Sequence, residues 1–177
     1  MKQNGFSLVE MLVVIAIAGI LAGLSVANFA GLTRKYNVDN EVRGIYSDLS
    51  NARIMAMNKN RTHFVDLTTT GYIVYDDTSP APDGDGALTV GSDTVVLTSN
   101  SALNLSTTTS RDFFPIVWNG TNPISFNSKG ICTTPGTICV YSTVQPLYDC
   151  ISIASTRIRL GKLLVQGSCS AANCQVK

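Results

Sequence analysis

Hydrophobic and polar positions divide the chain into three stretches with different patterns. A short polar start is followed by Glu10 and then by an almost unbroken apolar run over residues 11–27. Farther along, apolar residues recur at alternating steps of four and three: Val38, Val42, Ile45, Leu49, Ala52 and Ala56. That spacing is one face of an α-helix. Together the two patterns predict one long helix over residues 6–59, apolar all round in its first half and amphipathic in its second. Gly31 marks where it could be interrupted.

The remaining third stretch has the composition of short β-strands. Its segments are rich in β-branched and aromatic residues and are bounded by Gly, Pro, Asn or Ser, which is typical of strands. The predicted strands cover residues 62–67, 72–76, 94–98, 113–118, 124–127, 138–142, 150–154 and 157–165. Residues 68–71 resemble a hairpin connection. Several strands after a single helix predict an α+β fold, in which the long N-terminal helix packs on an antiparallel β-sheet domain.

Composition and cysteine usage indicate an exported protein. Charged residues make up 14% of the chain, against about a quarter of an ordinary globular protein. The net charge of +1 does not favour nucleic-acid binding driven by bulk charge. The five cysteines all lie in the last third, with no Cys-x-x-Cys pair and with a single histidine in the chain. This disfavours zinc and favours disulfides.

Five cysteines allow two disulfides and one free thiol. Cys132 and Cys139 flank a segment containing Pro-Gly, which can form a turn that brings them together. Cys169 and Cys174 flank four residues near the end of the chain. We expect these two local bonds. The main alternative joins Cys150 to either of the two terminal cysteines.

Catalytic and metal-binding patterns are weak. Gly84 and Gly86 are not followed by the Lys-Ser/Thr of a phosphate-binding loop. The nearby aspartates lack the full spacing of a calcium-binding loop, so we expect a solvated turn. His63 lies in a predicted strand with no supporting motif, so we expect it to be structural. The sequence therefore predicts no enzyme, no cofactor and no metal site.

The first ten residues resemble a known processing signal. Gly5, Phe6 and the following Ser-Leu-Val-Glu10 closely resemble the class III leader and N-terminal helix of type IV pilins and type II secretion pseudopilins. The resemblance implies that prepilin peptidase removes residues 1–5 and that Phe6 is N-methylated. It also implies that residues 6–60 form the helix, with 6–28 in the membrane or the filament core, and that 61–177 form a β-rich domain.

Glu10 has a defined role in this resemblance. A carboxylate inside a membrane segment costs about 2.5 kcal/mol or more at the bilayer centre and is usually paired. The resemblance implies that Glu10 pairs with the new α-amine of Phe6 on a neighbouring subunit. A carboxylate that merely sits at the level of the lipid headgroups is the alternative.

Further motifs resemble minor pilins and minor pseudopilins of the FimT/FimU and GspH type. They are Leu49-Ser-Asn-Ala-Arg53 with Ala56 and Asn58, Gly71-Tyr72, Phe126-Asn-Ser-Lys-Gly130, and Arg157-Ile-Arg-Leu-Gly-Lys162. The resemblance implies a minor pilin that joins other major and minor pilins or starts their assembly. It would lie in the inner membrane with its C-terminal domain in the periplasm, and then in the filament. The alternatives are a minor pseudopilin of a type II secretion system and a DNA-binding tip pilin.

The DNA alternative depends on three basic residues in the last predicted long strand. Residues two apart in a strand share a face, so Ile158 and Leu160 are expected to point inward and Arg157 and Arg159 outward. Some FimT-type relatives bind DNA through a basic C-terminal motif, and Arg157, Arg159 and Lys162 resemble it. We expect a solvated or subunit-contacting face here rather than a DNA site.

Overall fold

One continuous helix forms the axis of the molecule. The computed structural model describes residues 7–68, 71–99 and 116–176, and for residues 24–30 it gives the helix without the side chains. Helix α1 (Leu8–Lys59) has 52 residues and is about 78 Å long at the usual rise. It ends at Asn60, whose backbone is left-handed and whose N–H bonds the carbonyl of Ala56. The predicted long helix is confirmed, and it passes Gly31 without a break.

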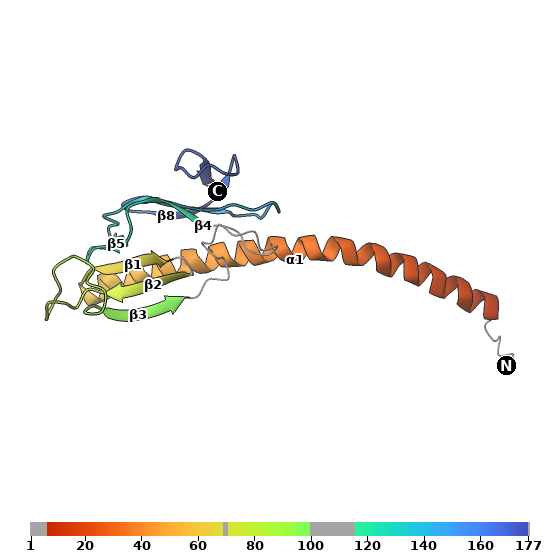
Figure 1. Ribbon diagram of the computed structural model, residues 1–177, viewed down its shortest axis with the longest axis horizontal. Helices are drawn as coiled ribbons and strands as arrows, with labels where there is room; N and C mark the ends of the chain where they lie inside the picture. Colours follow the sequence, from red (N-terminus) through yellow and green to blue (C-terminus); the bar gives the residue numbers. More distant parts are fainter. Residues whose placement is uncertain (1–6, 69–70, 100–115, 177) are drawn as a thin grey trace.

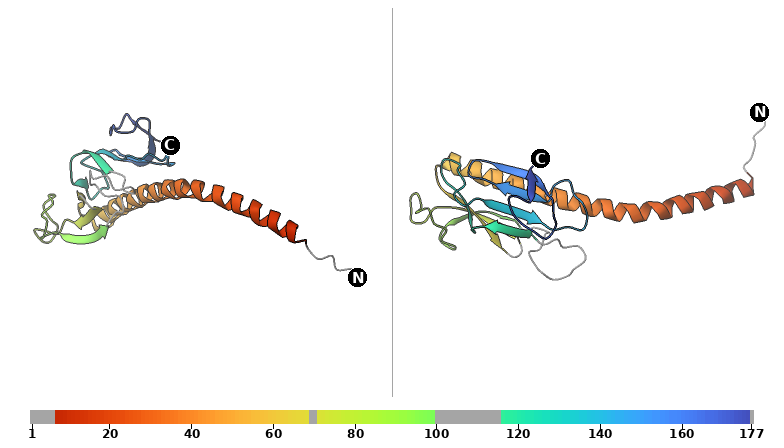
Figure 2. Two further views of the ribbon diagram at one scale, coloured as in Figure 1. Left: turned by 45° about the vertical axis from the view of Figure 1, so that its right-hand side comes forward. Right: turned by 90° about the horizontal axis from the view of Figure 1, so that it is seen from above.

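The two halves of α1 have different surroundings. The projecting half (residues 8–37) extends away from the rest of the molecule, and the packed half (38–59) lies along the β-sheets (Figures 1 and 2). The six predicted stripe residues of the packed half are all buried: Val38, Val42, Ile45, Leu49, Ala52 and Ala56. The amphipathic pattern therefore marks the face that the sheets cover.

The strands form two antiparallel sheets. The first has the order β3-β2-β1-β5 and contains β1 (His63–Thr68), β2 (Gly71–Asp76), β3 (Thr94–Ser99) and β5 (Ile124–Phe126). The second has the order β4-β6-β7-β8-β9 and contains β4 (Ile116–Gly120), β6 (Gly136–Val140), β7 (Cys150–Ile153), β8 (Ile158–Leu163) and β9 (Cys174–Val176). Thr68 pairs with Gly71, so the predicted hairpin is confirmed. The fold is α+β, as predicted. Residues 113–115 of one predicted strand lie outside the described residues, and β9 was not predicted.

The second sheet is covered on both faces. Along β6, Ile138 and Val140 point into the main core shared with α1, whereas Cys139 between them points to the opposite face. The C-terminal tail covers part of that opposite face (Figure 1). There Cys150, Leu163 and Cys174 form a small second core with Cys139.

Polar contacts fix the packed half of α1 to the strands and loops. The buried Tyr72 hydroxyl on β2 donates a hydrogen bond to Asp48 on the helix. The Tyr148 backbone N–H donates to Asp39 at 3.1 Å. Arg43, which pairs with Asp39 at 3.0 Å, also lies over the Tyr148 ring. These bonds set the position of the helix across both sheets.

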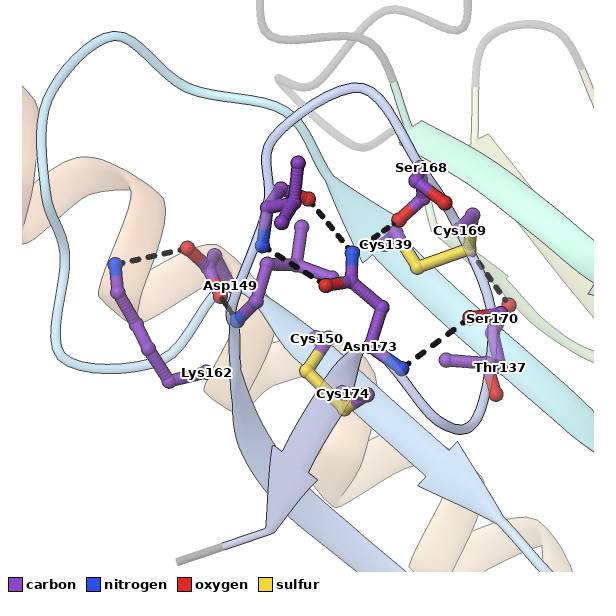
Figure 3. The surroundings of a disulfide bond; sticks show 12 residues. Thr137, Cys139, Asp149, Cys150, Lys162, Ser168, Cys169, Ser170, Asn173 and Cys174 are labelled. Atoms are coloured by element: carbon purple, nitrogen blue, oxygen red, sulfur yellow. Dashed lines mark hydrogen bonds and ion pairs between the residues drawn. A yellow bond between two sulfur atoms is a disulfide. The ribbon is translucent and has the colours of Figure 1, made fainter.

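The two predicted local disulfides are wrong. The structure joins Cys139 to Cys169 and Cys150 to Cys174, with Cα–Cα distances of 5.7 and 5.9 Å (Figure 3). Cys132 is the free thiol, buried in the main core, and burial raises its pKa.

Strand alternation explains the difference. Cys132 faces the helix side of the sheets, whereas Cys139 faces the tail, so the turn between them cannot join their sulfurs. Cys174 lies on β9 beside Leu163, within reach of Cys150. The alternative in which Cys150 pairs with a terminal cysteine is confirmed.

Candidate assembly surface

The projecting half of α1 exposes large apolar side chains on all sides. Among the large apolar residues exposed between Leu8 and Leu21, the exposed fraction runs from 49% at Val13 to 80% at Leu8. Burying one such side chain is worth about 1.5–3 kcal/mol. A helix that is apolar all round is stable only when lipid or other protein surrounds it. This surface therefore requires an apolar environment that the other described residues do not supply.

Glu10 is the only charged residue of the sequence between Ser7 and Thr33. It is exposed and lies in the first turn of α1, where the helix dipole favours a negative charge. Gly19 and Gly23 lie farther along, and a Cβ at either would meet nothing within 4 Å. Small residues at this spacing allow another helix to approach closely. The predicted cleavage site at Gly5 and Phe6 lies outside the described residues.

Among the residues that the structure describes, no helix is both long and apolar enough to cross a bilayer. The predicted membrane segment, residues 6–28, includes Phe6 and the side chains of 24–28, which lie outside that description.

The end of α1 near Arg53 and the Phe126–Gly130 motif lie close together. A Cβ on Gly130, whose φ is +69°, would lie 2.7 Å from the Met57 sulfur and 3.4 Å from Nε of Arg53. The Asn127 side chain holds this turn by accepting the N–H groups of Lys129 and Ile131 at 3.0 and 2.9 Å. The glycine is therefore required both by backbone conformation and by the closeness of the helix.

The three basic residues of the Arg157–Lys162 motif do not form one surface. Arg157 and Arg159 are exposed, while Ile158 and Leu160 pack on the main core, as predicted. Lys162 instead pairs with the buried Asp149 at 2.8 Å (Figure 3), and it also donates to the Pro146 carbonyl. Lys162 therefore does not join Arg157 and Arg159 on one exposed surface. Two arginines remain, because strand alternation turns Lys162 toward Asp149.

Asp149 was not singled out from the sequence. Its carboxylate is fully buried and also accepts hydrogen bonds from the Leu163 backbone N–H and from the Gln166 side chain. These partners lie 14 and 17 residues away, so no local pattern marks them. The cluster holds the start of the C-terminal tail in place.

The aspartate-rich turn after β2 is organised by its own backbone. Asp77 is buried and accepts N–H groups of Gly86 and Asp85 at 2.8 and 3.3 Å. The Asp93 carboxylate accepts the backbone N–H groups of Thr78, Ser79 and Thr89. Burial raises the pKa of Asp77. Within the described part of the chain, no three His, Cys, Asp or Glu side chains are grouped to hold a metal ion.

His63 is fully buried at the start of β1. Its Nδ1 lies 3.4 Å from the Arg61 carbonyl and its Nε2 lies 3.8 Å from the Asp76 carboxylate, which also pairs with Lys59 at 2.9 Å. Burial lowers the pKa of the ring, because it disfavours the charged form. The residue packs as a neutral side chain beside an ion pair.

A long helix with a projecting apolar half, packed by its other half on antiparallel sheets, defines a pilin-like subunit. The prokaryotic N-terminal methylation motif matches residues 1–26, and the family described as type II transport protein GspH matches residues 41–157. The chain belongs to this GspH family and is a minor pilin or pseudopilin of the GspH/FimT type. No curated protein and no solved structure matches the chain.

Membership has direct consequences. Proteins of this family are structural subunits of type IV pili or type II secretion systems and not enzymes. The N-terminal motif implies processing by prepilin peptidase and assembly with other pilins. It also implies that the protein resides in the inner membrane before it enters a filament.

Proposed function

We propose that this chain is a minor pilin that joins a type IV pilus, or starts its assembly, through the projecting half of α1. The observation that carries the proposal is the exposure of this apolar surface with Glu10 near its start. In a filament the surface is buried among the helices of neighbouring major and minor pilins. Before assembly, residues 6–28 lie in the inner membrane.

The N-terminal end provides the specific contact. Prepilin peptidase cleaves after Gly5, Phe6 is N-methylated, and the Glu10 carboxylate pairs with the charged α-amine of Phe6 on a neighbouring subunit. Pairing removes the cost of an isolated carboxylate in an apolar surrounding, which is about 2.5 kcal/mol or more at the bilayer centre. Glu10 thereby sets the axial position of one helix against the next.

The C-terminal domain suits a periplasmic location. Its two disulfides persist in an oxidising compartment. Each one fixes the C-terminal tail to the second sheet. The tail then remains on the domain surface when subunits are brought together.

Mass spectrometry of membranes and of purified pili tests the processing step. We expect a mature chain that begins at methylated Phe6 in both fractions. A Gly5→Leu variant is the control, and we expect it to keep residues 1–5 and stay out of the pili. An intact Met1 in the pili, or a cut after about residue 20, contradicts the proposal.

The family match supports a second candidate, a minor pseudopilin of a type II secretion system. Deletion of the gene that encodes this chain distinguishes the pilus subunit from the secretion-system subunit. Loss of surface pili with normal secretion supports the pilus, and accumulation of folded substrates in the periplasm supports the secretion system. A third candidate, a DNA-binding tip pilin, would use the exposed Arg157 and Arg159.

A further inference from the structure

The packed half of α1 carries a groove that the assembly of the projecting half does not use. The groove has a volume of about 200 Å³ and lies between α1 and β8. It is lined by Tyr46, Ser50, Arg53, Ile54, Met57 and Ile158. Ile54 is 48% exposed and Met57 43% exposed. Most of its wall is therefore apolar surface open to solvent.

Arg53 places an uncompensated cation in this apolar groove. Its Nε atom is buried and has no hydrogen-bond partner, and the described residues supply no ion pair to its guanidinium. Arg43 and Arg61 are paired, with Asp39 at 3.0 Å and with Asp76 at 3.9 Å, and Arg157 and Arg159 are exposed to solvent. A buried donor left without an acceptor is costly, and the planar guanidinium fork matches the geometry of carboxylates and phosphates.

A hydrogen-bonded turn lies beside the groove next to Met57 and Arg53. The turn at Gly130 closes against Met57 and Arg53, as described above, and that turn is held by the Asn127 side chain. Ile131, the next residue in the chain, is 38% exposed. The Arg53 side chain therefore lies close to this turn.

We propose that this Arg53 groove binds a different pilin-type subunit, through a carboxylate that is flanked by apolar side chains. The occupant follows from complementarity, because the groove offers apolar walls and one positive charge with no negative charge among its lining residues. It also lies on the same helix as the projecting half. The inference rests on the proposed function, since a minor subunit has other pilins as its neighbours.

A photo-crosslinking residue in place of Ile54, in the full-length chain and in cells that assemble the filament, tests this inference. Val90, which is 67% exposed and lies outside the groove, is the matched control position. We expect the probe at 54 to form a bond to another pilin-type subunit and the probe at 90 to form none.

Arg53 variants in the same cells test the charge. We expect Arg53→Met to reduce the crosslink at 54 by about tenfold or more, the size usual for removing one member of a charge pair. Arg53→Lys should retain part of it, and Arg159→Met should leave it unchanged. Intact Cys139–Cys169 and Cys150–Cys174 bonds in each variant show that the domain has folded.

Crosslinks that are absent, that join only copies of this chain, or that persist at full strength in Arg53→Met overturn the inference. The parent chain separates this failure from failure of the proposed function. If the parent enters filaments without a crosslink at 54, only the groove inference is wrong. If the parent is absent from filaments, the proposed function itself is wrong.

Discussion

The Lys162 ammonium lies 2.8 Å from the Asp149 carboxylate, whose side chain has no exposed surface. The pair sits at the base of the C-terminal tail, where Asp149 also accepts hydrogen bonds from Leu163 and Gln166. Lys162 is therefore a structural cation, and it differs in this respect from its exposed neighbours Arg157 and Arg159.

Replacing Lys162 should destabilise the domain. Lys162→Met leaves the buried Asp149 without its cation, and we expect the free energy of unfolding to fall by about 2 kcal/mol. Arg157→Met, on the exposed turn before β8, should change it by less than about 0.5 kcal/mol. Denaturant unfolding of the detergent-solubilised full-length chain measures both. Equal stability of Lys162→Met and the parent would refute the structural role.

Disulfide mapping should find Cys139 bonded to Cys169 and Cys150 bonded to Cys174. Removing either bond by a paired Cys→Ser change should cost about 2–4 kcal/mol, because each closes a long loop. Cys132→Ala should leave both bonds intact, and the Cys132 thiol should react with an alkylating reagent only after unfolding. A peptide that joins Cys132 to another cysteine contradicts this arrangement.

Local patterns predicted the helix and most strands because the spacing of apolar residues in a helix or a strand involves only residues close together in the sequence. The stripe from Val38 to Ala56 has one interpretation, a helix face that must be covered. The disulfides were missed because they depend on which face of a strand each cysteine occupies and on the path of the tail. The three-residue strand β9 is too short to give a pattern. Asp149 and Arg53 depend on contacts made by distant segments.

Lower pH should destabilise the fold through His63. Burial holds the pKa of its ring below the ordinary value, whereas in the unfolded chain the ring takes up a proton near pH ~6.5. The unfolded state then binds more protons, so stability decreases as the pH falls below about 6.5. Unfolding measured between pH ~7 and ~5 should show this slope, and His63→Gln should reduce it by up to about 1.4 kcal/mol per pH unit. An unchanged slope in the variant excludes His63 as the cause.

Duplex DNA should not bind to the β8 face. Lys162 is engaged by Asp149, which leaves Arg157 and Arg159 as the exposed cations of this motif. Two phosphate contacts give weak, strongly salt-dependent binding. We expect no gel shift by the full-length chain at ~50 mM salt, where phosphate-driven binding is still strong. A shift that disappears on joint Arg157→Ala and Arg159→Ala substitution would instead assign the DNA-binding function.

The central claim is that the chain works as a filament subunit held by its N-terminal helix, and Glu10 tests it most directly. Quantifying the chain in purified filaments, with the parent and Glu10→Ala expressed at equal levels, is the decisive measurement. We expect Glu10→Ala to be folded, cleaved and present in the membrane, but reduced at least about tenfold in filaments, since the loss of a buried charge pair is worth more than 1.4 kcal/mol. Glu10→Asp should retain part of the parent level. Incorporation of Glu10→Ala at the level of the parent contradicts the claim.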